Sequence, residues 1–192
     1  METVVMPMAY PLDDFYAQAR RPLPEITSIN GADMPEPYRT LLVHDADMTP
    51  TLEKFHGARI HLRVLNSQQR DGAYYREVAL LVDGTNAPVE FGAIKINLTL
   101  FPPNARKAIL EENLPLGHVL ADFRIKHTSR PKAYLRIHSD DFINEALALR
   151  GAQTLYGRRN TLFDPQQRSL AEIVEILPKL PLPENAAGAK TP

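Results

Sequence analysis

Residues 59–100 read RIHLRVLNSQQRDGAYYREVALLVDGTNAPVEFGAIKINLTL, and apolar side chains alternate with polar ones along much of this segment. Alternation with a period of two is typical of half-buried β-strands. It predicts three strands, at residues 60–64, 74–82 and 88–98. The dipeptides Asp71-Gly72 and Asp83-Gly84 lie at the boundaries between them, and both are hairpin signals. We therefore expect neighbouring strands to be antiparallel.

Outside this segment the sequence predicts both further strands and helices. Three further strands are predicted, at residues 132–138, 159–163 and Ser169–Leu177. Five helices are predicted, at residues 12–19, Met48–His56, 103–112, 116–123 and 140–149. Strands joined by tight turns with helices between them are typical of the α+β class. We expect an antiparallel sheet of about six strands with helices packed on one face.

The composition is that of a globular protein: of 192 residues, 44% are hydrophobic and 23% are charged. One core suffices at this length. We expect a single domain at residues 1–178, whose first 40 residues form a proline-rich N-terminal arm. Residues 179–192 contain almost no large apolar side chains, so we expect a disordered tail there.

The charge and the residue types exclude several functions. A net charge of -1 does not favour binding to nucleic acid or to anionic lipid, and we expect neither partner. No apolar segment is long enough to cross a bilayer, and the N-terminus lacks the pattern of a signal peptide, so we expect a cytoplasmic protein. Cysteine is absent, and the six histidines fit no metal-binding spacing. We expect neither a metal nor a cofactor.

Arg76 is the first candidate for a binding residue. It lies in YYREVALLV, where the apolar alternation predicts that one face of the strand is buried. A desolvated guanidinium requires an anion or several acceptors. A ligand could supply that anion, or Arg76 could pair with Glu77, Glu90 or another carboxylate across the strands.

Further charged residues lie near the C-terminus. Arg158 and Arg159 follow Gly157 at the start of a predicted strand, where they could bind a carboxylate or phosphate or form a solvated loop. Glu172 and Glu175 are three residues apart on the last strand, so they face opposite sides of the sheet. Only one of them therefore points toward the core, where it would pair with an arginine or act as a proton donor.

Five blocks occur in an order that resembles the chorismate pyruvate-lyase family and its wider chorismate lyase-like superfamily, over residues 40–178. They are LLVHDADMTPTLEKF, YYREVALLVDG, LPLGHVLADF, LYGRRNTLF and LAEIVEILP. The resemblance implies an antiparallel sheet with helical flaps that enclose a small internal ligand cavity. It also implies that Arg76 binds an aromatic carboxylate and that Met48 and Leu116 line the site.

The resemblance leaves two positions open. The family has a Glu on its last strand that faces the far end of the ring, and Val174 occupies its place here. Glu172 fits the alternation of the strand, whereas Glu175 would need a one-residue bulge. The lyases also carry an Arg where this chain has Ala93, so a second cation would come from elsewhere; the candidates are Lys95, Arg158 and Arg159.

On this resemblance we expect a cofactor-independent carbon–oxygen lyase that eliminates pyruvate from chorismate and gives 4-hydroxybenzoate. Catalysis would involve Arg76 and either Glu172 or Glu175. Two alternatives remain: a non-catalytic, sensor-like protein that binds a small aromatic acid, and an enzyme of the same fold for another carboxylated substrate. In each case the partner is a small molecule, and the protein is a monomer or a homodimer.

Overall fold

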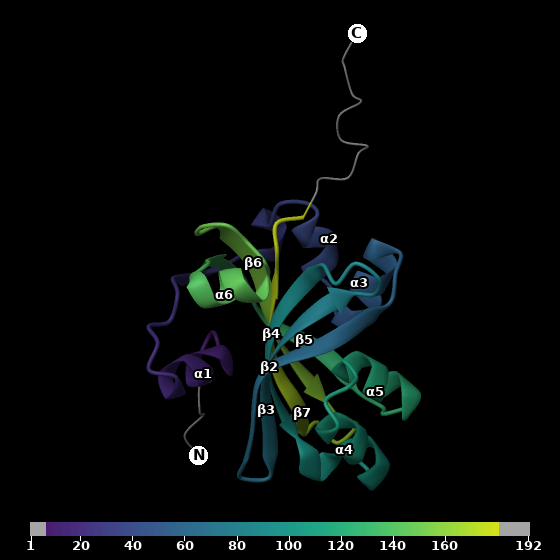
Figure 1. The fold of residues 1–192 in the computed structure, drawn as a ribbon. Helices are drawn as coiled ribbons and strands as arrows, with labels where there is room; N and C mark the ends of the chain where they lie inside the picture. The colour runs from purple at the N-terminus through teal and green to yellow at the C-terminus, as the bar shows by residue number, and fades with distance from the viewer. Residues whose placement is uncertain (1–6, 181–192) are drawn as a thin grey trace.

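A seven-stranded antiparallel sheet runs through the molecule in the order β1-β5-β6-β7-β4-β3-β2 (Figure 1). The structure is a computed structural model that describes residues 7–180. The strands span Ile26–Ile29 (β1), Ile60–Arg70 (β2), Ala73–Val82 (β3), Pro88–Asn97 (β4), Thr128–His138 (β5), Thr154–Phe163 (β6) and Ser169–Leu177 (β7). The prediction of an α+β protein with an antiparallel sheet is confirmed.

The seventh strand comes from the segment expected to be an N-terminal arm. β1 is only four residues long, which is too short for alternation to show in the sequence. It pairs with β5 at the edge of the sheet. The segment before residue 40 therefore contributes to the sheet.

The hairpin between β2 and β3 follows from its turn residues. Asp71 and Gly72 have φ angles of 52° and 74°, the left-handed conformation that a two-residue turn of this kind requires. The ladder then continues from β3 into β4 and from β4 into β7. β7 is the middle strand of the sheet, with β4 beside it, and β3 lies next to the edge strand β2.

Helices cover both faces of the sheet. Four lie on one side: α2 (Tyr38–Leu42), α3 (Met48–His56), α4 (Pro103–Leu110) and α5 (Leu116–Asp122). Two lie on the other: α1 (Leu12–Gln18) and α6 (Asp141–Ala146) (Figure 1). Short 3-10 helices occupy Gly31–Asp33 and Leu98–Leu100.

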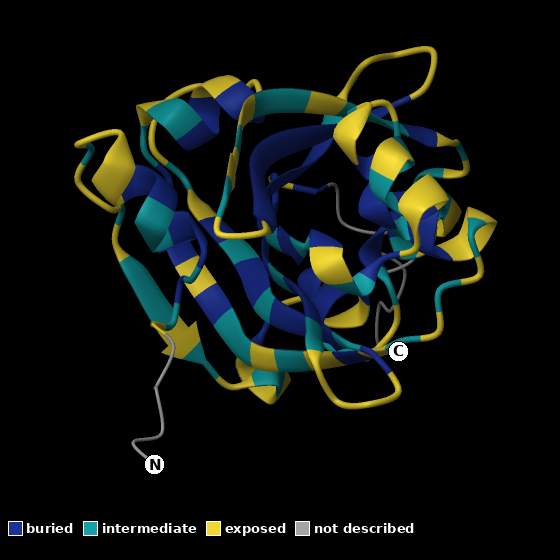
Figure 2. Ribbon diagram, turned by 90° about the horizontal axis from the view of Figure 1, so that it is seen from below, coloured by how far each residue is buried: buried dark blue, intermediate teal, exposed yellow. Residues whose placement is uncertain are grey.

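The placement of α1 and α6 differs from the expectation that helices pack on one face. Its cause is the burial of β3, in which all ten residues are buried. Figure 2 shows buried strand segments in the interior of the molecule. Both faces of such a strand carry side chains that must be shielded from water. α1 and α6 cover the face that carries Tyr75 and Phe91.

The ordered chain extends past the boundary expected at residue 178. The Tyr38 hydroxyl donates to the carbonyl oxygen of Pro178 at 3.2 Å and accepts from the amide of Leu180 at 3.1 Å. Leu180 is buried in the same cluster as Tyr38. The rest of the predicted disordered tail, residues 181–192, lies outside the described residues.

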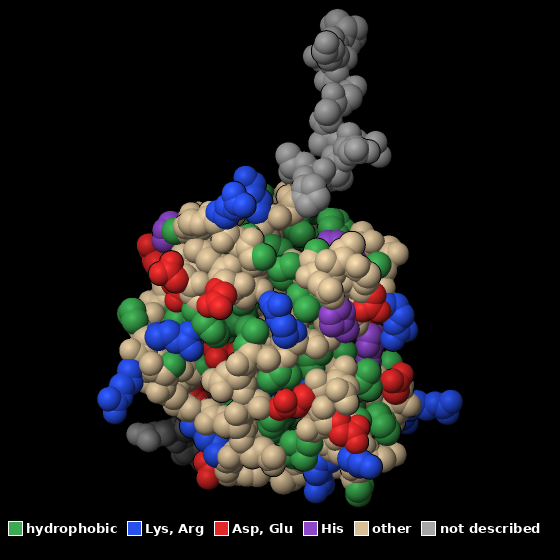
Figure 3. Space-filling model, in the orientation of Figure 1, with side chains coloured by type: hydrophobic (Ala, Val, Ile, Leu, Met, Phe, Trp, Pro, Cys, Tyr) green, Lys and Arg blue, Asp and Glu red, His purple; other side chains and the backbone are tan. Residues whose placement is uncertain are grey.

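The surface gives little further indication of a partner. On the face shown in Figure 3, acidic and basic side chains are interspersed. Within residues 7–180, no helix is long and apolar enough to span a membrane.

The hydrogen bonds of the Tyr38 hydroxyl should contribute to the stability of the folded protein. Tyr38→Phe removes the hydroxyl and leaves a buried amide and a buried carbonyl without a partner, so the free energy of unfolding should fall by about 1–3 kcal/mol in urea denaturation. Tyr156→Phe is the matched control, because the Tyr156 ring packs against Tyr38 at 4.8 Å but its hydroxyl makes neither of these bonds. Equal losses in the two variants would contradict the role of the Tyr38 hydroxyl.

Candidate functional site

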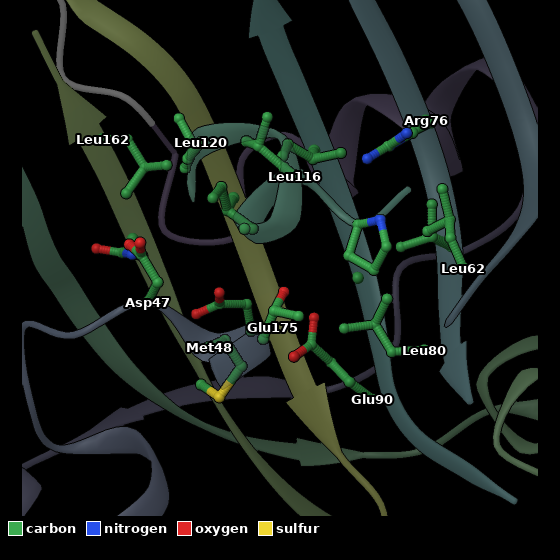
Figure 4. A pocket seen from close by; sticks show the side chains of 18 residues that line it. Asp47, Met48, Leu62, Arg76, Leu80, Glu90, Leu116, Leu120, Leu162 and Glu175 are labelled. Carbon is green, nitrogen blue, oxygen red and sulfur yellow. The ribbon is translucent and has the colours of Figure 1, made fainter. Parts of the chain in front are cut away.

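A cavity of about 60 Å³ lies between the sheet and the first residues of α3 and α5 (Figure 4). Most of its walls are apolar and come from strands and helices alike: Met48, Leu62, Val78, Leu80, Ile94, Leu116, Leu120, Leu162 and Ile173. Its polar side chains include Asp47, Arg76, Glu90, Asn160 and Glu175. Apolar walls with a few convergent polar groups are characteristic of small-molecule sites.

Strand alternation and register bring these polar groups to one face. Glu175 of β7 pairs with Gly92 of β4 on one side and with Arg158 of β6 on the other. Glu90 lies two residues before Gly92, and therefore on the same face. Arg76 enters from β3, away from the two carboxyl groups (Figure 4).

Arg76 is buried, with 2% of its surface exposed. Its Nη2 donates to the carbonyl oxygen of Leu114 at 3.4 Å, whereas Nε and Nη1 have no hydrogen-bond partner among the described residues. Burial lowers the pKa of Arg76, and Tyr74 and Glu112 partly oppose this shift. The guanidinium is thus a buried cation with two donors available to a ligand.

The expected alternative, an ion pair between Arg76 and a neighbouring carboxylate, is not found within residues 7–180. Glu77 follows Arg76 directly on β3 and so faces the opposite side of the sheet. Glu90 shares the face but forms no salt bridge with Arg76. Within the described part of the chain, Arg76 therefore forms no salt bridge, and Glu112, which accepts from the Tyr74 hydroxyl, acts on it only at longer range.

Arg158, unlike Arg76, has protein partners for its guanidinium nitrogens. It is fully buried, and its Nε donates to Glu175. Its two Nη atoms donate to the carbonyl oxygens of His44 at 2.8 Å and Ala46 at 3.0 Å. Arg158 therefore anchors the loop that leads into α3 and has little capacity left for a second carboxylate of a ligand.

Glu90, which the sequence suggested only as a partner for Arg76, also lines the cavity. It is 4% exposed, and its Oε2 has no partner among the described residues. Burial raises the pKa of the Glu90 carboxyl well above its usual range, the neighbouring Glu175 adds to the shift, and Arg158 opposes it. Glu90 lies two residues before Gly92, so strand alternation in the sequence could have placed both residues on the same face.

Three predicted site residues lie on the opposite face of the sheet: Lys95, Arg159 and Glu172. Lys95 pairs with Glu172 across β4 and β7, and its Nζ lies 5.7 Å from the Tyr10 ring. Arg159 Nη2 lies 3.5 Å from Glu172 Oε2. The β4–β7 register is continuous, so no bulge moves Glu172 into the cavity. The sequence left open which of the two glutamates faces the cavity; the register places Glu175 on the cavity face and Glu172 on the opposite one.

Met48 and Leu116 do line the cavity, each as the first residue of its helix. The two helices meet over the cavity where Thr49 contacts Gly117. A Cβ atom on Gly117 would lie 2.7 Å from Thr49 Oγ1, so only glycine allows this approach. His118 Nε2 lies 2.9 Å from Glu53 Oε1 and adds a second link between α5 and α3.

Comparisons with known proteins support the fold. No protein-family model matches the sequence, and no curated protein does. A gene product of Staphylococcus aureus has a similar structure (9% identity, 66% of this chain and 89% of that chain, TM-score 0.51). So does PhnF from Mycobacterium smegmatis (10% identity, 70% and 64%, TM-score 0.51). The effector domain of PhnF also matches (11% identity, 68% and 87%, TM-score 0.51).

These similarities establish the class of fold. This chain shares with PhnF and its effector domain an α+β fold built on an antiparallel sheet.

The prediction of a chorismate lyase, and with it of an enzyme, is wrong. The similar structures named above include PhnF and its effector domain, and none of them is a chorismate lyase. The cavity also differs from the expected one: Ala93 and Lys95 face away from it, and Arg158 is bound to Glu175 and to backbone carbonyls. A second cation that could hold the other carboxylate of chorismate is thus not found in the described site.

His127 makes the stability of the cavity wall depend on pH. Its Nε2 lies 2.9 and 3.0 Å from the two oxygens of Asp47, and its Nδ1 lies 2.8 Å from the carbonyl oxygen of Ile125. Both ring nitrogens face acceptors, so the protonated ring is favoured. The hydrogen bond with Asp47 raises the pKa of His127 above its ordinary value despite partial burial.

A raised pKa in the folded state stabilises the protein below the unfolded-state pKa, and this contribution is lost as pH rises through the folded-state pKa. His127→Gln should therefore lower the free energy of unfolding by about 1 kcal/mol near pH 5 and by much less near pH 9. His61→Gln is the control, because the His61–Asp83 pair is exposed and should contribute little at either pH. A loss from His127→Gln that does not change with pH would contradict the prediction.

Proposed function

We propose that this chain is a non-catalytic binding module for a small aromatic carboxylic acid, held in the cavity between the sheet and helices α3 and α5. The observation that carries the proposal is the buried Arg76, whose Nε and Nη1 are unpartnered within the described residues. A buried charge without a counter-ion is expensive. A carboxylate supplies the missing acceptors, and the planar guanidinium can bind it through two parallel hydrogen bonds.

The remaining walls fit the body of such a ligand. Val78, Ile94 and Ile173 present apolar side chains from neighbouring strands, and Met48 and Leu116 cover them from the helices. These surfaces suit a flat ring more than a polar chain. The small volume favours a compact ligand over a nucleotide or a peptide.

The arrangement of the cover suggests how binding would be communicated. α3 and α5 close the cavity through a few contacts, Thr49 with Gly117 and His118 with Glu53. A ligand that contacts both the sheet and these helices favours the closed arrangement by its differential affinity. This agrees with the effector domains that share the fold and supports a sensor-like role.

Calorimetric titration with benzoate and with 4-hydroxybenzoate tests the proposal. Arg76→Met should weaken the affinity for both acids by about thirtyfold or more, because the ligand carboxylate loses its buried partner. The same change removes an uncompensated buried charge, so the free energy of unfolding should stay equal or rise.

Arg159→Met is the matched control. It replaces the same residue type by methionine, but Arg159 lies on the face of the sheet that points away from the cavity. It should leave the affinity unchanged. Failure of the wild-type protein to bind either acid, or an equal loss in both variants, would overturn the proposed function.

A further inference from the structure

The segment between α4 and α5, residues 111–115, is tied to β3 at two points beside Arg76. The carbonyl oxygen of Leu114 accepts from Arg76 Nη2 at 3.4 Å. Glu112 accepts a hydrogen bond from the hydroxyl of Tyr74, which lies two residues before Arg76 and therefore on the same face of the strand. The Tyr74 ring centre is 5.9 Å from the guanidinium carbon of Arg76. The carboxylate of Glu112 is thus held near Arg76.

Glu112 acts on Arg76 through its charge. The Tyr74 hydrogen bond lowers the pKa of Glu112, and Ser67 and the charge of Arg76 lower it further, so Glu112 is ionised at neutral pH. In return, Tyr74 and Glu112 oppose the lowering of the Arg76 pKa by burial. The two residues form no salt bridge among the described residues, and Nε and Nη1 of Arg76 stay open to a ligand.

The backbone fixes the direction in which the Glu112 side chain leaves the chain. Glu112 follows the last residue of the α4 cap and has a φ angle of 58°, in the left-handed region. Its amide donates to the carbonyl oxygen of Ile109 at 3.3 Å. Glycine is favoured at such a position, and a residue with a Cβ atom is strained there. A test must therefore change the charge of Glu112 without changing its backbone.

A ligand carboxylate on Nε and Nη1 would be a second negative charge near the same guanidinium. Like charges repel each other, and the repulsion is stronger at a buried site than in water. In the empty cavity, by contrast, Glu112 partly compensates the buried charge of Arg76, which would otherwise be costly. The same carboxylate therefore stabilises the empty site and opposes the binding of an anion.

We infer that Glu112 is an affinity-determining residue, which serves as the counter-charge of Arg76 in the empty cavity and weakens the binding of an anionic ligand. This inference rests on the proposed function, in which Arg76 holds the ligand carboxylate. It requires that loss of the Glu112 charge lowers stability and raises affinity. A purely structural role of Glu112 would lower both.

Glu112→Gln tests the inference, because it keeps the size of the side chain, the backbone and an acceptor for the Tyr74 hydroxyl. In calorimetric titration the variant should bind benzoate about three- to tenfold more tightly than the wild-type protein. In urea denaturation without ligand, its free energy of unfolding should be lower than that of the wild-type protein, because Arg76 loses its compensating charge.

Glu111→Gln is the matched control. Glu111 is the preceding residue, and its exposed carboxylate lies 3.8 Å from the exposed ammonium of Lys107. Such a surface pair contributes little, so this variant should change neither the affinity nor the stability. An unchanged or weaker affinity of Glu112→Gln, or an equal gain from Glu111→Gln, would overturn the inference.

A double-mutant cycle with Arg76→Met tests the charge interaction without any ligand. The loss of unfolding free energy caused by Glu112→Gln should be smaller in the Arg76→Met background, because the attraction that it removes is already gone there. Equal losses in the two backgrounds would show that Glu112 does not act through Arg76, and the inference would fail.

The outcomes distinguish the inference from the proposed function. If benzoate binds through Arg76 but Glu112→Gln does not tighten the binding, the inference fails and the proposed function stands. If neither benzoate nor 4-hydroxybenzoate binds the wild-type protein, the proposed function fails and the inference fails with it.

Discussion

The buried pair of Arg158 and Glu175 connects the sheet to the loop before α3, one of the segments that cover the cavity. Arg158 binds Glu175 on the adjacent strand with one nitrogen, and with the others it holds the carbonyls of His44 and Ala46. Those carbonyls belong to the loop that leads into α3, whose first residues form a wall of the cavity. Removing either partner would leave a charge buried without compensation, which is among the more destabilising changes a core can suffer.

Arg76 shows the same residue type in the opposite condition. Both arginines are buried on one face of the sheet, yet Arg158 is saturated and two nitrogens of Arg76 have no partner in the described chain. The two arginines therefore have different roles. Arg158, whose hydrogen bonds are satisfied, holds the loop before α3, whereas Arg76 has nitrogens available to bind an anion. Glu90 extends this division to the acidic side, because Glu175 has an arginine and Glu90 does not.

Alternation in the sequence was enough to predict the hairpins of β2, β3 and β4 and the burial of Arg76. It could not assign the faces of β7, because a shift of one residue in register moves every side chain to the other side of a sheet. Aligning the last strand on Leu177 left Glu172 and Glu175 both open, and the pairing of Gly92 with Glu175 places Glu175 on the cavity face. The register likewise places Lys95 on the face of the sheet opposite the cavity. Only the cross-strand register contains this information.

The resemblance to chorismate lyases predicted the fold correctly and the activity wrongly, and the charges in the cavity show why the two can separate. The dianion chorismate requires two cations free to bind it. In the described cavity Arg76 is free, Arg158 is neutralised by Glu175, and Glu90 adds a further acidic group. Such a balance suits a ligand with a single negative charge. The backbone that forms the cavity is compatible with either chemistry, so a few charged side chains on its strands determine which ligands it can hold.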